Sequence, residues 1–579
     1  MSAQQIITQH LDIWTAAHKT RSGVGRGSSN KLDLYGIKKL RELILELAVR
    51  GKLVPQDAND EPASELLKRI AHDIAESEKS GTIKKDVPVS INSDDEPFDL
   101  PAGWEMVSFG NICTIERGGS PRPIQDFLTN APDGINWIKI GDSDIGGKYI
   151  TSTAEKIRKE GLVKTRMVYP GDFLLTNSMS FGRPYITQIE GCIHDGWLRI
   201  SPPKELDKNF LYYLLSSPFI FRSFKKAAAG AVVLNLNADK VRVVELLLPP
   251  LAEQHRIVAK VDELMAFCDQ LEQTQSDNIA AHAQLVEALL ATLTNSSDHT
   301  ELQNNWQRIA THFDTLFTTE HSIDQLKQTI LQLAVMGKLF PQNPTDEPAS
   351  ELLKKIAAEK NRLEIEERLR TTAEECIDES EHYIQLPHGW EFARLGNLAK
   401  FIDYRGKTPT KVESGIPLIT AKNVRFGYID RDPAEYITES DYEVWMTRGY
   451  PRLNDILFTT EAPLGNVALV DIEDKFALAQ RVICFQLHEP DLARFIRIAI
   501  MSAQFQNQLI ENATGMTATG VKASKLKEIP IVIPPLEEQH RIVAKVDELM
   551  ALCETLKINL QNAQTTQLAL ADALVEQAI

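Results

Sequence analysis

The chain has 579 residues, of which 43% are hydrophobic, enough for three or four domains that each bury a core of their own. Its formal net charge of −17 argues, taken alone, against nucleic acid as a partner. The polar start Met1–His10 lacks the apolar core of a signal peptide, and no run of about eighteen apolar residues predicts a membrane span. Six scattered cysteines without a CxxC pair indicate reduced thiols, so we expect a cytoplasmic protein.

The first predicted element is a helical region that the chain repeats. Residues 37–71 (IKKLRELILELAVRGKLVPQDANDEPASELLKRIA) and 323–357 (IDQLKQTILQLAVMGKLFPQNPTDEPASELLKKIA) are identical at roughly two thirds of their positions. Each is followed by an acidic spacer and then by a domain that opens with LPAGWE at 100–105 or LPHGWE at 386–391. Because the whole order repeats, the sequence indicates a tandem duplication.

The charge is uneven along each copy. The spacers Asp73–Asp99 and Glu359–Glu381 each carry a net charge of roughly −5. The segment 101–248 sums to about +3 and the segment 387–533 to about −1, so local DNA contact stays open there. We interpret the spacers as solvated linkers or helices; the alternative is that they mimic DNA or hold a basic partner.

The central domains are predicted to be α/β or mostly β. Four short runs bounded by Gly, Pro, Asp or Asn predict strands: GDFLLTN (171–177), GWLRIS (196–201), DILFTT (455–460) and RVICFQL (481–487). Late in each domain, FLYYLLSSPFIFRSF (210–224) and ARFIRIAIMSAQFQNQLIE (493–511) predict helices. Their matching placement indicates a common fold.

Each copy closes with a predicted long helix. Residues 249–267 (PPLAEQHRIVAKVDELMAF) and 534–552 (PPLEEQHRIVAKVDELMAL) begin with a Pro-Pro pair that ends the preceding strand and fixes a helix start. In the first copy a heptad seam follows at Ile257, Val261, Leu264, Cys268 and Leu271, and the second copy repeats this spacing. Gln275 and Asn278 interrupt the seam after about two heptads, so we expect a local helix pair rather than a long fibre.

The two copies have diverged unequally. The helical segments agree even at polar positions, whereas the central domains agree mainly at framework residues. Identical surfaces suggest two copies of one partner, and different surfaces suggest two different ligands. The alternative is that the polar identities are helix-pairing contacts, since charges beside a heptad seam set pairing. The candidate partner-binding residues are His255, Arg256, Lys260, Glu263, His540, Arg541, Lys545 and Glu548.

The chain resembles the specificity subunits of type I restriction-modification systems over nearly its whole length. The doubled PPL-EQHRIVAKVD helix and the GWE openings carry the resemblance. So do ERGGSPRP (116–123), YRGKTPTK (404–411), GIPLITAKNV (415–424), FTTEAPLGNVALV (458–470), LAQRVICFQL (478–487) and TGMTATGVKASKLKEIPIVIPPL (514–536). The first domain departs from the family pattern, because LTNSMSFGRPYI (175–186) and IHDGWLRI (193–200) replace the TEAPLG and QR forms.

The resemblance implies an α/β (α+β) tandem duplication with pseudo-two-fold symmetry. Two target-recognition domains with β-rich cores are separated and joined by long paired antiparallel helices. The expected divisions are a helical region and linker (1–100), the first recognition domain (101–248), a central helical spacer (249–386), the second recognition domain (387–533) and a closing helix (534–579).

The resemblance also implies what such a chain does. Each domain reads one half of an asymmetric, bipartite double-stranded DNA site, and the helices set the distance between the halves. The helices bind two methyltransferase subunits that methylate adenine with S-adenosylmethionine, and motor-nuclease subunits that use ATP and Mg join them. Independently, a pseudo-dimer with unlike domains is expected to read a split, asymmetric target, as a symmetric dimer reads a palindrome.

Candidate base-reading residues are the side chains that suit base edges and lie in turn-rich segments beside predicted strands. In the second domain these are Arg405, Lys407, Thr408, Lys422, Asn423, Gln480, Arg481, Thr517, Thr519 and Lys522. In the first domain they are Arg117, Ser120, Arg122, Lys139, Ser178, Ser180, Arg183, Asn235, Asn237 and Lys240. Alternatively, Thr408 and Asn423 cap turns, Gln480 satisfies the backbone, and Asn235 and Asn237 are turn residues. Trp104 and Trp390 are interpreted as core anchors rather than stacking platforms.

Motifs for covalent chemistry are missing from the sequence. Pro-Pro occurs without the Asn or Asp of an adenine methyltransferase motif, and Phe401 stands where a phosphate-binding loop ending in Gly406-Lys407-Thr408 demands glycine. No HExxH metal site and no dinucleotide-binding loop occur. We therefore expect a recognition subunit that is not an enzyme. Two rivals stay open: a protein-protein scaffold without base readout, and a nuclease built on Asp455, Glu473 and Lys475.

Overall fold

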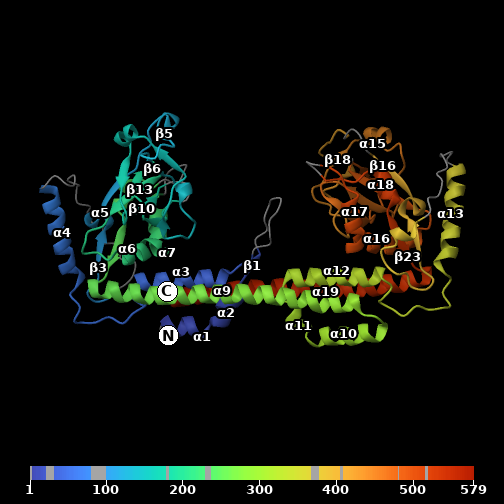
Figure 1. The fold of residues 1–579 in the computed structure, drawn as a ribbon, viewed down its shortest axis with the longest axis horizontal. Helices are drawn as coiled ribbons and strands as arrows, with labels where there is room; N and C mark the ends of the chain where they lie inside the picture. Colours follow the sequence, from blue (N-terminus) through green and yellow to red (C-terminus); the bar gives the residue numbers. More distant parts are fainter. Residues whose placement is uncertain are drawn as a thin grey trace. The chain divides into compact units, whose positions relative to one another are not determined.

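The structure is a computed structural model that describes residues 3–20, 32–79, 100–177, 181–228, 236–366, 377–404, 409–479, 481–515 and 519–579. The chain divides into two compact units (Figure 1). Unit 1 comprises Met1–Asp277 and Ala563–Ile579, and unit 2 comprises Asn278–Asn562.

Unit 1 combines a helical base with a β-rich domain. The base holds α1 (Ala3–Gln9), α2 (Leu11–Ala16), the short hairpin β1 (Lys19–Thr20) and β2 (Leu32–Asp33), α3 (Tyr35–Val49) and α4 (Ala63–Lys79). The domain contains β3 (Glu105–Ser108), α5 (Phe109–Ile112), β4 (Thr114–Arg117), β5 (Leu128–Thr129), β6 (Ile135–Ile138), β7 (Tyr149–Ile150), β8 (Glu155–Ile157), β9 (Arg166–Val168), β10 (Phe173–Thr176), β11 (Pro184–Thr187), β12 (Gly191–Ile193), β13 (Trp197–Ser201), α6 (Lys208–Ser216), α7 (Pro218–Ala228), α8 (Ala238–Arg242) and β14 (Glu245–Leu248). Its sheets run β4-β13-β10-β11-β7, β5-β8-β6-β12-β9 and β14-β3, and the long helix α9 (Leu251–Asn295) follows.

Unit 2 repeats this order. Its base holds α10 (His299–Thr311), α11 (Phe313–Leu316), α12 (Glu320–Val335) and α13 (Ala349–Glu366). Its domain contains β15 (Glu391–Arg394), α14 (Leu395–Leu398), β16 (Ala399–Asp403), β17 (Ile416–Ile419), β18 (Tyr436–Ile437), α15 (Glu439–Trp445), β19 (Ile456–Thr460), β20 (Leu464–Leu469), β21 (Ala477–Leu478), β22 (Val482–Leu487), α16 (Ala493–Met501), α17 (Ala503–Glu511), α18 (Ala523–Glu528) and β23 (Pro530–Ile533). The sheets run β16-β22-β19-β20, β18-β17-β21 and β15-β23, and α19 (Leu536–Ala578) follows.

The four predicted strand runs form the centres of the two main sheets. They correspond to β10, β13, β19 and β22, and β10 pairs with β13 as β19 pairs with β22, both antiparallel. Each predicted helical run is two helices rather than one. Ser217 and Ser502 adopt extended backbone between the two, and Ser502 caps α17 by accepting a hydrogen bond from the Phe505 amide. A capping serine starts a new helix at the point where the first one ends.

The long helices begin at Leu251 and Leu536, directly after the Pro-Pro pairs, as predicted. Their heptad seams are buried, but each seam packs in the same core as a shorter helix of its own unit. Arg41 of α3 contacts Asp269 of α9 at 2.6 Å in unit 1. The expected interruption at Gln275 and Asn278 ends the seam but not the helix, because polar side chains such as these, half-buried at Gln275 and exposed at Asn278, do not break helical backbone.

Each unit contains the start of one long helix and the end of the other. Leu293 of α9 is buried in the core of unit 2, and Ala571 of α19 in the core of unit 1. Matched lysines bind the two helix ends: Lys52 donates to the Ile579 carbonyl at 2.8 Å, and Lys338 donates to the Thr294 carbonyl at 2.6 Å. Cations are favourable at helix C-termini because the last carbonyls lack intrahelical partners.

In unit 1 a set of buried contacts, which we call the joint, fixes the β-rich domain to the start of its long helix. The Trp104 indole is buried and donates from Nε1 to Glu253 Oε2 at 3.0 Å. Arg256 binds Asp60 through two contacts of 3.1 and 2.5 Å. Gly51 has a φ of 65°, and a Cβ there would lie 2.6 Å from the ring of Pro101. The GKL, DEPAS, GWE and EQHR motifs therefore meet at one place.

In unit 2 the equivalent residues make the same contacts. Trp390 donates to Glu538 Oε2 at 3.0 Å, and Arg541 contacts Asp346 at 2.6 Å. Gly337 stands in the same relation to the ring of Pro387, again at 2.6 Å. The interpretation of both tryptophans as core anchors is confirmed by their burial, at 5% and 3% exposed.

The joint yields a prediction for stability. The Asp60 side chain, the partner of Arg256, is only 9% exposed. Asp60→Ala removes this partner, so the packing of the domain at the start of α9 should be destabilised by about 1–3 kcal/mol. Hydrogen exchange should accelerate in α4 and the first turns of α9, while unit 2 keeps its protection. Lys68→Ala breaks an exposed pair with Glu65 and is the control, with no expected change. Equal effects of both substitutions would refute the joint.

Candidate nucleic-acid interface

Matching main-chain hydrogen bonds bring the same three segments together in both domains. In unit 1 the Asn177 amide donates to the Gly196 carbonyl at 3.0 Å, and the Leu236 amide donates to the Asn177 carbonyl at 2.9 Å. In unit 2 Thr460 donates to the Arg481 carbonyl at 2.9 Å, and Val521 donates to the Thr460 carbonyl at 3.0 Å. We call this place the reading edge: the loop after β10 or β19, the turn before β13 or β22, and the segment before α8 or α18.

In the first domain three of the predicted residues, Arg117, Ser120 and Arg122, contact Asp195. Asp195 accepts from the Ser120 hydroxyl at 2.7 Å and faces Arg122 at 3.4 Å. The Asp195 carbonyl accepts from Arg117 Nε at 3.3 Å and from the Asn177 amide group at 2.8 Å. Three side chains predicted as base readers thus lie around a residue that the prediction did not include.

The surroundings of Asp195 keep it charged. Burial acts to raise the pKa of this carboxyl, but the Ser120 hydrogen bond and the charges of His194, Arg117 and Arg122 outweigh burial and lower the pKa. Beside it lies a cavity of about 800 Å³, lined among others by Trp137, Arg122 and Lys139. Lys139 is paired with Glu155 at 2.7 Å inside that lining.

In the second domain the segment that contains Thr519 and Lys522 lies next to Glu461, the partner of Arg481. Arg481 has a φ of 75° and pairs through Nε with Glu461 Oε1 at 2.5 Å. Glu461 forms a β-bridge with Gly520, which places the exposed Thr519 and Lys522 beside this ion pair. Lys522 occupies the N-cap position of α18 without capping through its side chain.

Other predicted residues have structural contacts. Asn423 is 2% exposed; its oxygen accepts from the Thr420 amide and hydroxyl, and its amide group donates to the carbonyls of Asp430 and Pro433. The turn-capping alternative therefore describes Asn423, while its neighbour Lys422 is exposed. In the first domain Asp142 takes the equivalent role by accepting from the Lys139 amide at 2.7 Å.

At α8 the polar side chains support the helix. Asn237 caps α8 by accepting from the Lys240 amide at 2.9 Å, as the turn alternative expects, and Lys240 Nζ donates to the Ala228 carbonyl at 3.3 Å. Arg183 follows the reading loop and is half-buried. The remaining predicted positions lie outside the described residues: Ser178, Ser180, Asn235, Arg405, Lys407, Thr408, Gln480 and Thr517.

The candidate partner-binding residues divide into two groups. Arg256 and Arg541 point into the joints of their own units. The other six are exposed or half-buried on the helices, with His255 61% and His540 53% exposed. Lys260 pairs with Glu263 at 2.8 Å and Lys545 with Glu548 at 2.9 Å, within the same helix turn.

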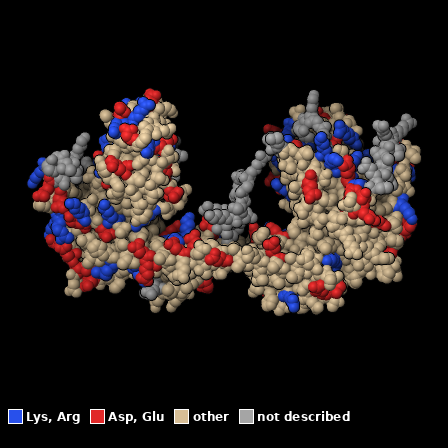
Figure 2. Space-filling model, in the orientation of Figure 1, with Lys and Arg blue, Asp and Glu red and all other residues tan. Residues whose placement is uncertain are grey.

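Sequence reasoning missed the carboxylates at both reading edges. Asp195 and Glu461 lie inside the IHDGW and TEAPLG segments, so the positions were visible as motifs. A search for hydrogen-bond donors to DNA passes over acids, so neither carboxylate was selected. Figure 2 accordingly shows basic and acidic side chains interspersed over both domains in this view.

Groups that could support catalysis have other partners. Asp455 accepts from the Arg452 amide and the Gln486 side chain, both at 2.7 Å, and burial raises its pKa although these bonds oppose the shift. Lys475 pairs with Glu439 at 2.9 Å. Among the described residues, no three His, Cys, Asp or Glu side chains are placed to hold a metal ion. No helix in the described ranges has the length and hydropathy needed to cross a membrane.

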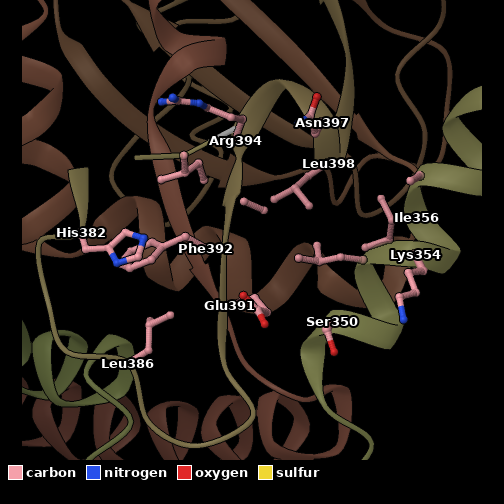
Figure 3. A pocket seen from close by; sticks show the side chains of 14 residues that line it. Ser350, Lys354, Ile356, His382, Leu386, Glu391, Phe392, Arg394, Asn397 and Leu398 are labelled. Atoms are coloured by element: carbon pink, nitrogen blue, oxygen red, sulfur yellow. The ribbon is translucent and has the colours of Figure 1, made fainter. Parts of the chain in front are cut away.

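A second cavity, of about 650 Å³, lies at the base of the second domain (Figure 3). Its side chains come from α13, residues 377–386, β15 and α14, and none is a predicted site residue. Arg394 is held there by both carboxylate oxygens of Glu381, at 2.6 and 2.8 Å, so its charge is balanced. The rings of His382 and Phe392 stack at 4.6 Å along one side.

Known proteins match this chain in sequence. Residues 101–281 and 387–563 match the family described as type I restriction modification DNA specificity domain. The specificity subunits of the type I restriction enzymes EcoAI and EcoEI of Escherichia coli are 39% and 38% identical, each over 100% of both chains. The HsdS subunit from Thermoanaerobacter tengcongensis is 18% identical in a structural match that covers 84% of this chain and 98% of that one, with a TM-score of 0.39.

The fold and the matching reading edges define a tandem protein in which each unit carries one recognition domain on its own helical base. The chain belongs to the family of type I restriction-modification specificity subunits.

The contacts of Asn423 lead to a prediction that separates support from readout. Asn423→Ala leaves buried groups without partners and should destabilise the second domain by about 2–3 kcal/mol. Lys422→Ala, one residue away and exposed, should change stability by no more than about 0.5 kcal/mol. Urea unfolding followed by hydrogen exchange in β17 and β18 measures both. A stability loss for Lys422→Ala as large as for Asn423→Ala would contradict the assignment.

Proposed function

We propose that this chain is the DNA sequence-specificity subunit of a type I restriction-modification complex. Each recognition domain, 101–248 and 387–533, reads one half of an asymmetric bipartite site in double-stranded DNA. The observation that carries this is the pair of reading edges, which share their main-chain hydrogen bonds and differ in their side chains. A common scaffold with unlike side chains is what two different half-sites require.

The helical parts supply spacing and docking in this proposal. Family relatives are named as specificity subunits of restriction enzymes, which supports partner subunits for this chain as well. Two methyltransferase subunits that use S-adenosylmethionine dock on the helices, and motor-nuclease subunits that use ATP and Mg complete the complex. Because Arg256 and Arg541 belong to the joints, docking rests on the exposed identical residues, above all His255, Glu263, His540 and Glu548.

Affinity for DNA comes largely from contacts to phosphates, so binding weakens steeply with salt. A net charge of −17 means that the chain alone binds DNA weakly and depends on basic surfaces of its partners. The chain itself contributes recognition and not catalysis. Each partner then flips one adenine of the positioned site for methylation.

Mapping methylated adenines tests the proposal. DNA from a host that expresses this chain with its methyltransferase subunits should show one bipartite motif. Replacing residues 101–248 with the corresponding domain of a relative should change one half of that motif only. A change in both halves would contradict modular reading, and methylation without sequence preference would favour the protein scaffold.

Arg481→Ala gives a finer test. Loss of a bidentate contact to a base should lower methylation of the cognate site by about 5- to 100-fold and relax one base pair of the second half-site. Arg431→Ala, which breaks an exposed pair with Asp471 in the same domain, is the control with no expected change in specificity. If Arg481→Ala lowers methylation of every sequence equally, Arg481 contacts the phosphate backbone instead.

A further inference from the structure

At both reading edges an arginine faces a carboxylate from a neighbouring segment, and in the first domain that arginine, Arg122, comes from the loop after β4. In the first domain Asp195 Oδ2 faces Arg122 Nη2 at 3.4 Å, and Arg117 lies beside it. In the second domain Glu461 Oε1 faces Arg481 Nε at 2.5 Å. The acids come from different segments, the turn before β13 and the loop after β19, so the pairing recurs although the residues are not equivalent.

Fold stability does not explain these pairs. Arg122 is 81% exposed and Arg481 is 52% exposed, and ion pairs between exposed side chains contribute little to stability. A carboxylate at a surface that meets DNA phosphates also repels them. The acids therefore have a cost for binding, which points to a role in discrimination between sequences.

The fixed position of each acid supports such a role. Ser120 and His194 both contact Asp195 Oδ1, at 2.7 and 3.0 Å, and leave Oδ2 toward Arg122. Glu461 is held through its backbone by the bridge to Gly520, and the backbone of Arg481 is set in the left-handed region. Arg122 can thus exchange partners while the Asp195 carboxylate stays in place, and at the second edge the backbones of Glu461 and Arg481 keep their positions.

Arginine and carboxylate together are complementary to one base pair. In the major groove guanine offers two acceptors, O6 and N7, that suit arginine, and its partner cytosine offers the N4 amino donor that suits a carboxylate. When the arginine moves from its carboxylate to guanine, the carboxylate becomes free to accept a hydrogen bond from the N4 amino group of cytosine. At other base pairs the exchange is incomplete, because adenine and thymine do not offer two acceptors side by side.

We propose that Asp195 and Glu461 are specificity-determining residues that, with Arg122 and Arg481, each read a G·C base pair in one half-site. This rests on the proposed function, since it names the base pair and the residues of the same reading edges. Each carboxylate occupies its arginine until a G·C pair replaces the contact, and so penalises binding to other sequences.

The experiment uses the complex of the full chain with its methyltransferase subunits. Initial methylation rates are measured on duplexes in which each base pair of each half-site is varied in turn. For Asp195→Asn, the ratio of cognate to non-cognate rates should fall by about 5- to 100-fold at one G·C position of the first half-site, with the second half-site unaffected. Glu461→Gln should do the same in the second half-site only.

Matched controls are Asp133→Asn and Glu439→Gln, which neutralise exposed acids paired with Lys159 and Lys475 in the same two domains. They should leave the ratios unchanged. The proposal is wrong if Asp195→Asn and Glu461→Gln slow all duplexes equally, or raise all rates without changing any ratio. A complex with the unaltered chain that shows no sequence preference would instead overturn the proposed function.

Discussion

The structure depends on one constraint, the buried joint between each recognition domain and the start of its long helix. A tryptophan donates to a buried glutamate, and an arginine one helical turn further on pairs with an aspartate from the preceding helical region. Buried polar groups of this kind must be satisfied, since an unpaired partner is costly. The joint therefore fixes the orientation of the domain on its helix, and little substitution is tolerated there.

The joint also explains why the domain behaves as an insertion. Its first strand and its last strand pair with each other: β3 runs antiparallel to β14, with Glu105 opposite Leu248, and β15 pairs with β23 in the same way. The chain enters and leaves each domain at the same place, directly beside the Pro-Pro start of the long helix. Surface changes between those two strands can leave the helical base intact, whereas residues such as Arg222, which pairs with the buried Glu46 of α3, belong to a core that domain and base share. The shared entry and exit point is the physical basis for the proposed exchange of one domain without the other.

Contacts between each long helix and its own domain change the interpretation of the identical polar residues in the two helices. Identity at polar positions of the two helices suggested a shared partner or helix pairing, but several of these residues face their own domain. Arg256 and Arg541 serve the joints, Tyr213 donates to Asp262, and Arg494 pairs with Asp547 at 2.6 Å. A constraint inside each unit thus keeps part of the helix surface alike, and only the exposed identities point outward.

Residues with a strong local signal were predictable, and residues defined by distant partners were not. Proline pairs fix helix starts and apolar runs between turn residues fix strands, so α9, α19, β10, β13, β19 and β22 follow from short stretches of sequence. Asn423 resembles a base-reading residue because asparagine suits adenine and because it lies in a predicted turn. In the structure it is buried and makes four hydrogen bonds, with partners up to ten positions away. Asp195 is the reverse case, since its importance comes from Ser120 and Arg122, more than seventy positions earlier.

The support of the reading edge is what allows the two domains to differ. The bonds that place it, Asn177 to Gly196 and Thr460 to Arg481, join main-chain atoms only. Main-chain bonds survive replacement of the side chains, provided that the new residue tolerates the local backbone. The same turn can therefore carry His194 and Asp195 in one domain and Arg481 in the other, with an acid supplied from whichever loop lies next to the arginine. Recognition can therefore change by substitution at exposed positions of the edge such as Arg481, while the main-chain bonds keep the edge in place.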